Sequence, residues 1–538
     1  MIHPSARLLF LSLVASVLLL PTSEAKDKTK ERRKVDKLQP LVDFIESETM
    51  FSPESGFTVL FEQEPVSGEH KGDVDLAAQR LHLRNGQMLW NAQQSLPVST
   101  SVYTEDHLAA LGDGSGGLFA VYRATAKTGK HAEDSEVLAQ RLSPEGKPLW
   151  HEGKKSTVVA STEWNESRPL LSPDGKGGVI VVYQLSTDKG QHAGDSDLAA
   201  QRIDANGNLV WEAKEGVPVS NSDVRETNHA ILPRPDGGVL VVFEATPRKG
   251  KRAGISGIFA QAISVDGKLL WNQGEHPTAV SLSTWSEHAP TLISDGAGGA
   301  FVVFTQHSIT GEHAGDKDLA VQRILADGTM AWNKGERSMI ISDSKFMESK
   351  PVLMPDGAGG IIVAFESEPR TGERTGNSDI WAQRIGPDGK RLWNDGKPAL
   401  VATSLWSERS PSITPTAGGD VLIAFEQHAP RGEHAGDVDI AAQRLDSKGT
   451  VLWHDGGRAI ELANSARKET QPTLLPDGEG GAVMVFQAEA RSGQYAGDKD
   501  IHAVRFDANG TLLWNEGKQP AVVATSALME RNFVVVTQ

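Results

Sequence analysis

The residues of this chain best suited to bind a ligand are tryptophans and carboxylates that recur at matching places. Three tryptophans stand 121 residues apart: Trp164, Trp285 and Trp406. Each is followed two residues later by a glutamate: Glu166, Glu287 and Glu408. An indole beside a carboxylate offers a stacking surface with a hydrogen-bond acceptor, which suits sugars, or cationic groups through cation–π attraction. We therefore predict ligand pockets at these six residues. The alternative is that these indoles only pack between structural elements.

Paired acids form a second candidate site. Five glycine-bearing segments carry two aspartates one residue apart: Asp73/Asp75, Asp195/Asp197, Asp316/Asp318, Asp437/Asp439 and Asp498/Asp500. Two such carboxylates could begin a calcium site, although calcium requires several further oxygen ligands. Calcium is thus the one cofactor that the sequence suggests. The alternative is a structural role shared with a recurrent arginine, because one repeat has Ile255 and Gly257 in place of the acids and Ala262 in place of that arginine.

The elements that position these residues follow from a longer repeat. Tryptophans recur every 60 or 61 residues, at Trp90, Trp150, Trp211, Trp271, Trp332, Trp393, Trp453 and Trp514. Such a fixed period indicates a repeat architecture. A glycine stands four residues before each of these tryptophans, and a glutamate opens the first strand expected in each unit. We interpret the eight periodic tryptophans as packing residues, and the recurrent glutamates as structural partners of the recurrent arginines.

Each unit contains four short, apolar, β-rich stretches separated by turn sequences, with no long helical periodicity. In the third unit, Asp174–Gly178 and Asp204–Gly207 are the turns, since glycine readily adopts the positive φ angles that tight turns demand. Eight such units predict an all-β chain that forms an eight-bladed β-propeller of four-stranded antiparallel blades. The spacing of 121 residues indicates pseudo-fourfold symmetry from two-blade repeats.

A resemblance supports the same fold. The segment from Ala200 to Trp211, Ala-Gln-Arg-Ile-Asp-Ala-Asn-Gly-Asn-Leu-Val-Trp, resembles the tryptophan-docking repeat of eight-bladed quinoprotein propellers and of related propellers in outer-membrane assembly. The resemblance spans roughly residues 46 to 525 and is one of fold. The adjacent cysteine pair of the quinoprotein enzymes is absent, because the chain contains no cysteine.

The ends of the chain predict export. Arg7 precedes an apolar run from Leu8 to Leu20, and residues 23–25 offer a small-residue cleavage site. We therefore expect a signal peptide at 1–25, a charged linker at 26–40 and the propeller at 41–538, with 528–538 closing the ring. The mature protein would be periplasmic or extracellular, without a membrane span. A net charge of −16 argues against a nucleic-acid partner.

These features lead to an expectation about function. The near-identity of the repeats predicts an exported, non-enzymatic binding or scaffold propeller that recognises a glycan or a protein partner on its loop-rich face. Two alternatives remain open at this point. One is a calcium-binding envelope protein, and the other is a hydrolase or lyase with its site over the central channel.

Overall fold

The computed structural model describes residues 56–537, apart from 66–71, 91–94, 100, 102, 128–133, 188–192, 213–214, 221–223, 282, 309–314, 336, 343, 373, 417, 430–435, 457–458, 494–495 and 525–527. The predicted signal peptide and charged linker therefore lie outside the described residues. In the described part, no helix is long and apolar enough to cross a membrane.

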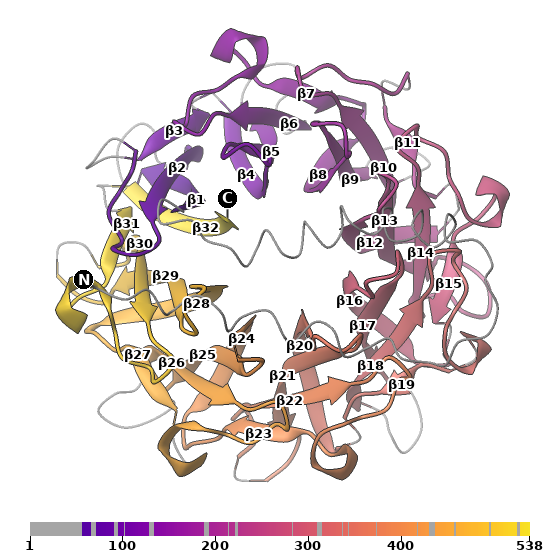
Figure 1. Cartoon of the computed structure of the whole chain (residues 1–538). Coiled ribbons are helices and arrows are strands. Elements are labelled where there is room, and N and C mark those ends of the chain that lie inside the picture. The colour runs from indigo at the N-terminus through magenta and orange to yellow at the C-terminus, as the bar shows by residue number, and fades with distance from the viewer. Residues whose placement is uncertain are drawn as a thin grey trace, which may run out of the picture. The chain divides into compact units, whose positions relative to one another are not determined.

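Eight four-stranded antiparallel sheets form a ring, so the predicted all-β eight-bladed propeller is confirmed (Figure 1). From the channel outward, blade 1 consists of β32 (Leu528–Thr537), β1 (Gly56–Pro65), β2 (Asp75–His82) and β3 (Leu96–Ser99). Blade 2 consists of β4 (Tyr103–Gly112), β5 (Leu118–Ala126), β6 (Ser135–Leu142) and β7 (Thr157–Ala160). Blade 3 consists of β8 (Asn165–Pro173), β9 (Val179–Thr187), β10 (Asp195–Ile203) and β11 (Val217–Pro218). Blade 4 consists of β12 (Val224–Pro233), β13 (Val239–Pro247), β14 (Gly257–Ile263) and β15 (Thr278–Ser281).

The remaining blades repeat this order. Blade 5 consists of β16 (Ser286–Ser294), β17 (Ala300–His307), β18 (Lys317–Ile324) and β19 (Met339–Ile340). Blade 6 consists of β20 (Phe346–Pro355), β21 (Ile361–Pro369), β22 (Asp379–Ile385) and β23 (Ala399–Ala402). Blade 7 consists of β24 (Ser407–Pro415), β25 (Val421–His428), β26 (Val438–Leu445) and β27 (Ile460–Ala463). Blade 8 consists of β28 (Arg467–Pro476), β29 (Ala482–Ala490), β30 (Lys499–Phe506) and β31 (Ala521–Ala524).

The strand from the end of the chain completes the first blade. β32 pairs antiparallel with β1, from Phe57↔Thr537 to Pro65↔Leu528, and supplies the innermost strand of that sheet. This pairing joins two segments from opposite ends of the propeller and covers the edge of β1.

The eight periodic tryptophans wedge each blade against the next, as predicted, and are only 2–8% exposed. Each indole Nε1 donates a hydrogen bond of 2.8–3.4 Å to a backbone carbonyl of the following blade. The eighth, Trp514, donates to Arg84 of blade 1 and so continues the pattern around the ring. The preceding glycine has a clear reason, because a Cβ on Gly207 would lie 2.6 Å from Trp150 of the neighbouring blade.

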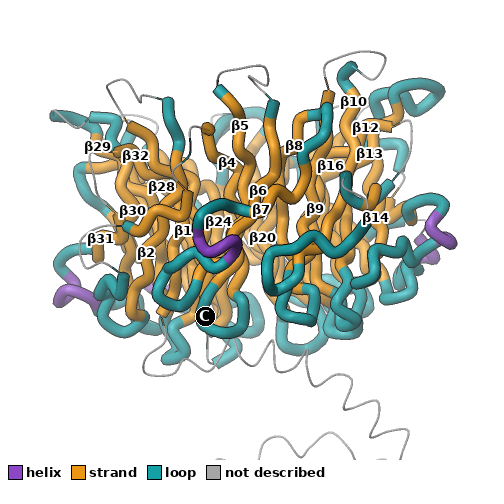
Figure 2. Tube along the Cα trace, turned by 90° about the horizontal axis from the view of Figure 1, so that it is seen from above, coloured by secondary structure: helices purple, strands orange, loops and turns teal. Residues whose placement is uncertain are grey.

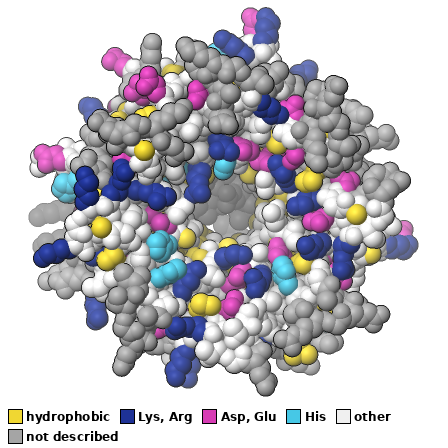
Figure 3. Space-filling view, turned by 180° about the vertical axis from the view of Figure 1, so that it is seen from behind, with side chains coloured by type: hydrophobic (Ala, Val, Ile, Leu, Met, Phe, Trp, Pro, Cys, Tyr) yellow, Lys and Arg dark blue, Asp and Glu magenta, His cyan; other side chains and the backbone are white. Residues whose placement is uncertain are grey.

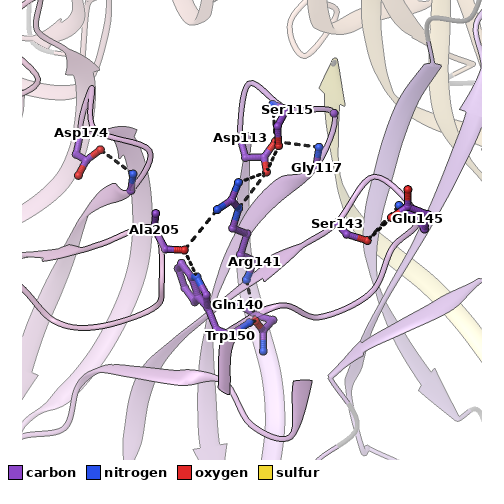
Figure 4. A network of polar contacts seen from close by, with 12 residues as sticks. Asp113, Ser115, Gly117, Gln140, Arg141, Ser143, Glu145, Trp150, Asp174 and Ala205 are labelled. Carbon is purple, nitrogen blue, oxygen red and sulfur yellow. Dashed lines mark hydrogen bonds and ion pairs between the residues drawn. The ribbon is translucent and has the colours of Figure 1, made fainter. Parts of the chain in front are cut away.

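The recurrent arginine of the third strand belongs to the same junction (Figure 4). Arg141 donates to Asp113 in the turn between the first two strands of its blade, at 3.0 and 2.8 Å, and to Ala205 of the next blade, where Trp150 also donates. The predicted partnership between this arginine and the first-strand glutamate is therefore wrong. The turn aspartate is the nearer partner, and the glutamate lies toward the opposite end of the blade.

The turns between the first and second strands, and between the third and fourth, lie at one end of the propeller. The connections from the second strand to the third, and the crossings between blades, lie at the other end (Figure 2). We call this second end the loop-rich face. It carries every candidate site residue named above.

Candidate functional site

The three predicted indoles are half-buried on the loop-rich face, each on a different blade. Trp406 lines a cavity of about 700 Å³ together with Glu408, Gln427, His454 and Glu461. Trp285 lines another cavity, of about 740 Å³, together with Asp316 and Asp318. The structure thus leaves the predicted indoles partly open to solvent but does not bring them together into one site.

The strand register revises the predicted alternation of aromatic residues. The position two residues before the first-strand glutamate is occupied around the ring by Tyr103, Trp164, Val224, Trp285, Phe346, Trp406, Arg467 and Leu528. Aromatic residues therefore also occur in blades 2 and 6. The two-blade pattern holds for tryptophan in blades 3, 5 and 7 but not for aromatic character in general.

The glutamates predicted to assist these indoles are buried. Glu166, Glu287 and Glu408 are each 0% exposed. Glu287 accepts hydrogen bonds from the Ser281 hydroxyl at 2.6 Å, the Ser283 amide at 3.1 Å and the Ile258 amide at 3.3 Å. These bonds fix the loop that carries the indole. Among the three, Glu408 also lines the same cavity as its indole.

Most of these first-strand glutamates lie opposite an acid of the preceding blade. Burial raises the pKa of Glu105 and of Glu469 to about 7, and that of Glu348 to about 8, and repulsion from Asp75, Asp439 and Asp318 respectively adds to the effect. Burial likewise raises the pKa of Glu166 and of Glu408 to about 7. A carboxyl group with such a pKa can keep its proton near neutral pH and share it with the facing carboxylate.

The first acids of the predicted calcium pairs are held in ion pairs. Four of them contact a cation of the next blade: Asp73–Lys127, Asp195–Arg248, Asp316–Arg370 and Asp437–Arg491. In the fifth pair, Asp500 contacts Arg467 at 2.5 Å, while burial raises the pKa of Asp498. The second acids Asp75, Asp197, Asp318 and Asp439 lie beside the first-strand glutamates just described. Among the described residues, no three acids or histidines are grouped to hold a metal ion.

The innermost strands contain a feature that the sequence did not reveal. Every one carries a β-bulge two residues after its glutamate, where a residue other than glycine adopts φ between 46° and 58°. These eight bulge residues are His107, Arg168, Asn228, Ala289, Lys350, Ser410, Gln471 and Asn532. A bulge redirects side chains, and left-handed backbone at residues other than glycine costs roughly 1 kcal/mol or more each. Eight different side chains therefore present themselves at equivalent places around the channel.

One junction beside these bulges holds an acid–base pair. The Glu244 carboxylate is 4% exposed and accepts hydrogen bonds from Asn228 Nδ2 at 2.7 Å, the Ala289 amide at 2.5 Å and His288 Nδ1 at 3.2 Å. Burial opposes the ionisation of Glu244, but these three donors together hold its pKa below the ordinary value. Because the carboxylate can only accept, it fixes the tautomer of His288 with the proton on Nδ1. The Nε2 atom of His288 is then the basic one.

The surroundings of this pair are also polar. The ring of His307 lies 5.1 Å from that of His288, and burial, with Lys317 nearby, lowers the pKa of His307 to about 4. On the other side, Arg168 Nη1 donates to Asn228 Oδ1 at 2.7 Å. A continuous series of hydrogen bonds thus runs from Arg168 through Asn228 and Glu244 to His288.

Equivalent positions around the ring do not repeat this pair. At each junction, a second-strand residue of one blade faces the residue after the first-strand glutamate of the next. The eight combinations are Glu62/Asp106, Arg123/Ser167, Gln184/Thr227, Glu244/His288, Thr305/Ser349, Glu366/Arg409, Glu426/Thr470 and Gln487/Arg531. In this set of described positions, a carboxylate meets an imidazole only between blades 4 and 5. The ring is therefore chemically asymmetric.

The channel itself is hollowed on the opposite side of the ring. A cavity of about 520 Å³ is lined by Glu62, Asp106, His107, Arg531 and Asn532, which belong to blades 1 and 2. Blade 1 faces blade 5 across an eight-membered ring. On the loop-rich face, basic, acidic and histidine side chains surround the central hollow (Figure 3).

Sequence reasoning missed Glu244 and His288 because neither belongs to a recurrent motif. A usable signal existed in the departures from the repeat: aligning the eight units on the first-strand glutamate places a single histidine, His288, at the following position. The bulges carried no comparable signal, because none of the eight residues is glycine.

The chain matches no known protein-family model, and no curated protein matches it. Several solved structures are similar at 11–12% identity. An ulvan lyase of polysaccharide lyase family PL25, bound to a sugar, is 12% identical over 74% of this chain and 91% of that one, with a TM-score of 0.42. Polysaccharide lyase Uly1 is 11% identical over 64% and 79%, with a TM-score of 0.38. An α-L-arabinofuranosidase from Lactobacillus brevis is 12% identical over 54% and 93%, with a TM-score of 0.30.

These comparisons overturn one expectation from the sequence. The prediction of a non-enzymatic binding or scaffold propeller is wrong, because the similar structures just named are carbohydrate-active enzymes. The physical reason for the error is that the near-identity of the repeats lies in the packing residues. The residues that face the channel differ from blade to blade, and those are the ones that chemistry would use.

Proposed function

We propose that this protein is a carbohydrate-active enzyme that cleaves a glycan by acid–base catalysis at the channel mouth on the loop-rich face. The observation that carries the proposal is the Glu244–His288 pair, which occupies one of eight equivalent junctions. A symmetric scaffold has no use for a polar pair at a single junction, whereas a catalytic centre requires one.

The geometry of the pair suits general acid–base work. The side chain of His288 is 34% exposed, whereas that of Glu244 is 5% exposed and receives three hydrogen bonds. A buried ionised carboxylate orients the imidazole and stabilises its protonated form, as in other carboxylate–histidine pairs. Through Nε2, His288 would remove a proton from the substrate and return it to the leaving oxygen. Glu244 acts as a positioning residue.

Two hollows support a glycan as the substrate. The channel cavity lined by Asp106, His107 and Asn532 supplies hydrogen-bonding groups of both kinds opposite the catalytic pair. The cavity of Trp406 adds a partly exposed indole beside carboxylate and amide groups. Sugar rings present an apolar face that stacks on an indole and hydroxyl groups that bond to such polar side chains.

The test is a cleavage assay on a panel of neutral and acidic polysaccharides, with wild-type protein and His288→Ala. His151→Ala is the matched control, because His151 lies in the turn after a packing tryptophan, at the other end of the blade. We expect wild type and His151→Ala to cleave at least one polysaccharide and His288→Ala to cleave it at least about a thousandfold more slowly. Equal rates for wild type and His288→Ala, or no cleavage of any polysaccharide by wild type, would overturn the proposal.

A further inference from the structure

Arg168 is an exposed cation at the channel whose charge is not neutralised by a neighbouring carboxylate. Its one hydrogen bond to a side chain goes to the neutral Asn228 Oδ1, at 2.7 Å. Within the described part of the chain, no aspartate or glutamate lies within ion-pair distance of its guanidinium group. The other channel cations differ in this respect, since Lys350 contacts Glu366 at 3.3 Å and Arg531 contacts Glu64 at 2.8 Å.

The backbone holds Arg168 in this position. Arg168 and Asn228 occupy equivalent bulges of β8 and β12, with φ angles of 50° and 49°. Left-handed backbone at two such residues persists only where the surrounding structure enforces it. The bulges therefore place a guanidinium and an amide side by side at the channel surface.

The same amide connects the guanidinium to the acid–base pair. Asn228 Nδ2 donates to Glu244 Oε1 at 2.7 Å, and Glu244 Oε2 contacts His288 Nδ1 at 3.2 Å. Two residues thus separate the cation from the imidazole, which places both within reach of a single bound sugar. A guanidinium binds carboxylate or sulfate oxygens through two parallel hydrogen bonds.

A lone cation is also unusual for this protein, whose net charge is −16. The excess of negative charge repels anionic ligands from the molecule as a whole. A cation left without an ionic partner beside the catalytic pair offers such a ligand one attractive position. The site therefore selects where an acidic group can be placed.

We propose that the substrate is a uronic-acid-containing glycan, that Arg168 binds the uronate carboxylate, and that His288 cleaves the glycan by β-elimination. This inference rests on the proposed function and specifies its substrate class and reaction. Charge neutralisation by Arg168 makes the carbon–hydrogen bond next to the carboxylate more acidic. Arg168 is then a substrate-binding residue that determines specificity.

The reaction balances without a co-reactant. His288 Nε2 takes the proton from the carbon that bears the carboxylate, and the electron pair of that bond forms a carbon–carbon double bond. The bond from the adjacent carbon to the glycosidic oxygen breaks, and this oxygen leaves with a proton from the protonated His288. The products are one unsaturated uronate end and one ordinary hydroxyl end, and no water is consumed.

The experiment measures the ultraviolet absorbance of the unsaturated product together with new reducing ends. Full-length wild type, Arg168→Gln and Arg168→Lys are given polygalacturonate, alginate and heparosan as uronate polymers, with dextran sulfate and dextran as sulfated and neutral arms. Arg225→Gln is the matched control, because Arg225 is an exposed arginine of the same face outside the bulges. The melting temperature of each variant verifies that it is folded.

We expect unsaturated product from at least one uronate polymer and from neither dextran. Arg168→Gln should lower kcat/KM on that polymer about a hundredfold, Arg168→Lys less, and Arg225→Gln should match wild type. Cleavage of dextran alone, or reducing ends without unsaturated product, would overturn the inference while leaving a glycan-cleaving function in place. Cleavage of no polymer would remove the proposed function as well. Arg168-dependent binding of dextran sulfate, with no action on the uronate polymers, would assign the cation to sulfate and also overturn the inference.

Discussion

Two sets of buried glutamates show how the environment assigns different roles to the same side chain. Burial raises the pKa of Glu105 to about 7, because its hydrogen bonds from Ser99 and Ser101 do not offset desolvation. Glu244 is comparably buried, yet an imidazole, an amide side chain and a backbone amide hold its pKa below the ordinary value. The first environment favours a neutral acid and the second an ionised carboxylate. Only the second can orient and stabilise an imidazolium.

The role of Glu244 as a positioning residue predicts a specific loss. Glu244→Gln preserves the shape of the side chain but removes the negative charge that supports protonated His288. We expect kcat on the cleaved glycan to fall between about tenfold and a thousandfold with KM nearly unchanged, since the carboxylate does not touch the substrate. Steady-state kinetics provides the measurement.

Glu366→Gln is the control for this variant. Glu366 lies at the equivalent place in blade 6 and accepts the Ser410 amide at 2.7 Å, but it faces Arg409 instead of a histidine. It should retain the wild-type kcat. Similar losses in both variants would show that the carboxylates act on the structure of the ring and not on the reaction.

At the scale of the strands, the repeat separates packing from chemistry. The outer faces of the strands carry the same residue types in every blade, since Gln140, Arg141 and Trp150 have counterparts around most of the ring. The eight bulges repeat in conformation while their side chains vary. A fixed backbone with variable side chains is the arrangement by which a rigid scaffold carries binding residues.

This separation explains what the sequence could predict. The period of Trp90 to Trp514 and the turn glycines determine blade number and wedge packing, because both depend on repeated local contacts. The pairing of Glu244 with His288 could not be predicted, because it crosses from one blade to the next and depends on a bulge at Ala289 that has no glycine. The indoles were located correctly on the loop-rich face, but their separation on different blades needed the structure.

The wedge between blades predicts the stability of two tryptophan variants. Trp150→Phe keeps most of the apolar contact but loses the 3.0 Å hydrogen bond from Nε1 to Ala205. We expect it to lower the free energy of unfolding by about 1 kcal/mol. Within the described residues, the buried Nε1 of Trp381 has no hydrogen-bond partner, so Trp381→Phe should cost less or be neutral. Urea denaturation compares the two, and a larger cost for Trp381→Phe would contradict the wedge account.

For the whole molecule, carboxyl groups facing one another between blades couple the ring to pH. The folded-state pKa values of Glu105, Glu166, Glu408 and Glu469 are about 7 and that of Glu348 is about 8, against an ordinary value of 4.5. Between pH 5 and 8 the folded protein therefore binds more protons than the unfolded chain. Its stability must fall as the pH rises through this window.

This linkage predicts a melting temperature that is higher at pH 5 than at pH 8 by roughly 5 °C or more. Glu348→Gln replaces a proton-sharing acid by an amide that donates without titrating. The variant should melt higher than wild type at pH 8 and close to wild type at pH 5. Differential scanning calorimetry at the two pH values is the measurement.

Glu287→Gln is the contrasting variant, because blade 4 has Gly257 where the facing acid stands elsewhere. Glu287 accepts the Ile258 amide, and an amide nitrogen in its place cannot do so. We expect Glu287→Gln to lower the melting temperature at both pH values. A gain at pH 8 equal to that of Glu348→Gln would contradict the role assigned to the facing acids.

The most direct test of the account compares five equivalent positions around the ring. His288 and its uncharged counterparts Ser167, Thr227, Ser349 and Thr470 are each changed to alanine, and kcat is measured on the glycan that the wild type cleaves. We predict that His288→Ala loses at least about a thousandfold in kcat while the other four remain within about threefold of wild type. Retained activity in His288→Ala, or an equal loss at the other four positions, would contradict an asymmetric catalytic centre between blades 4 and 5.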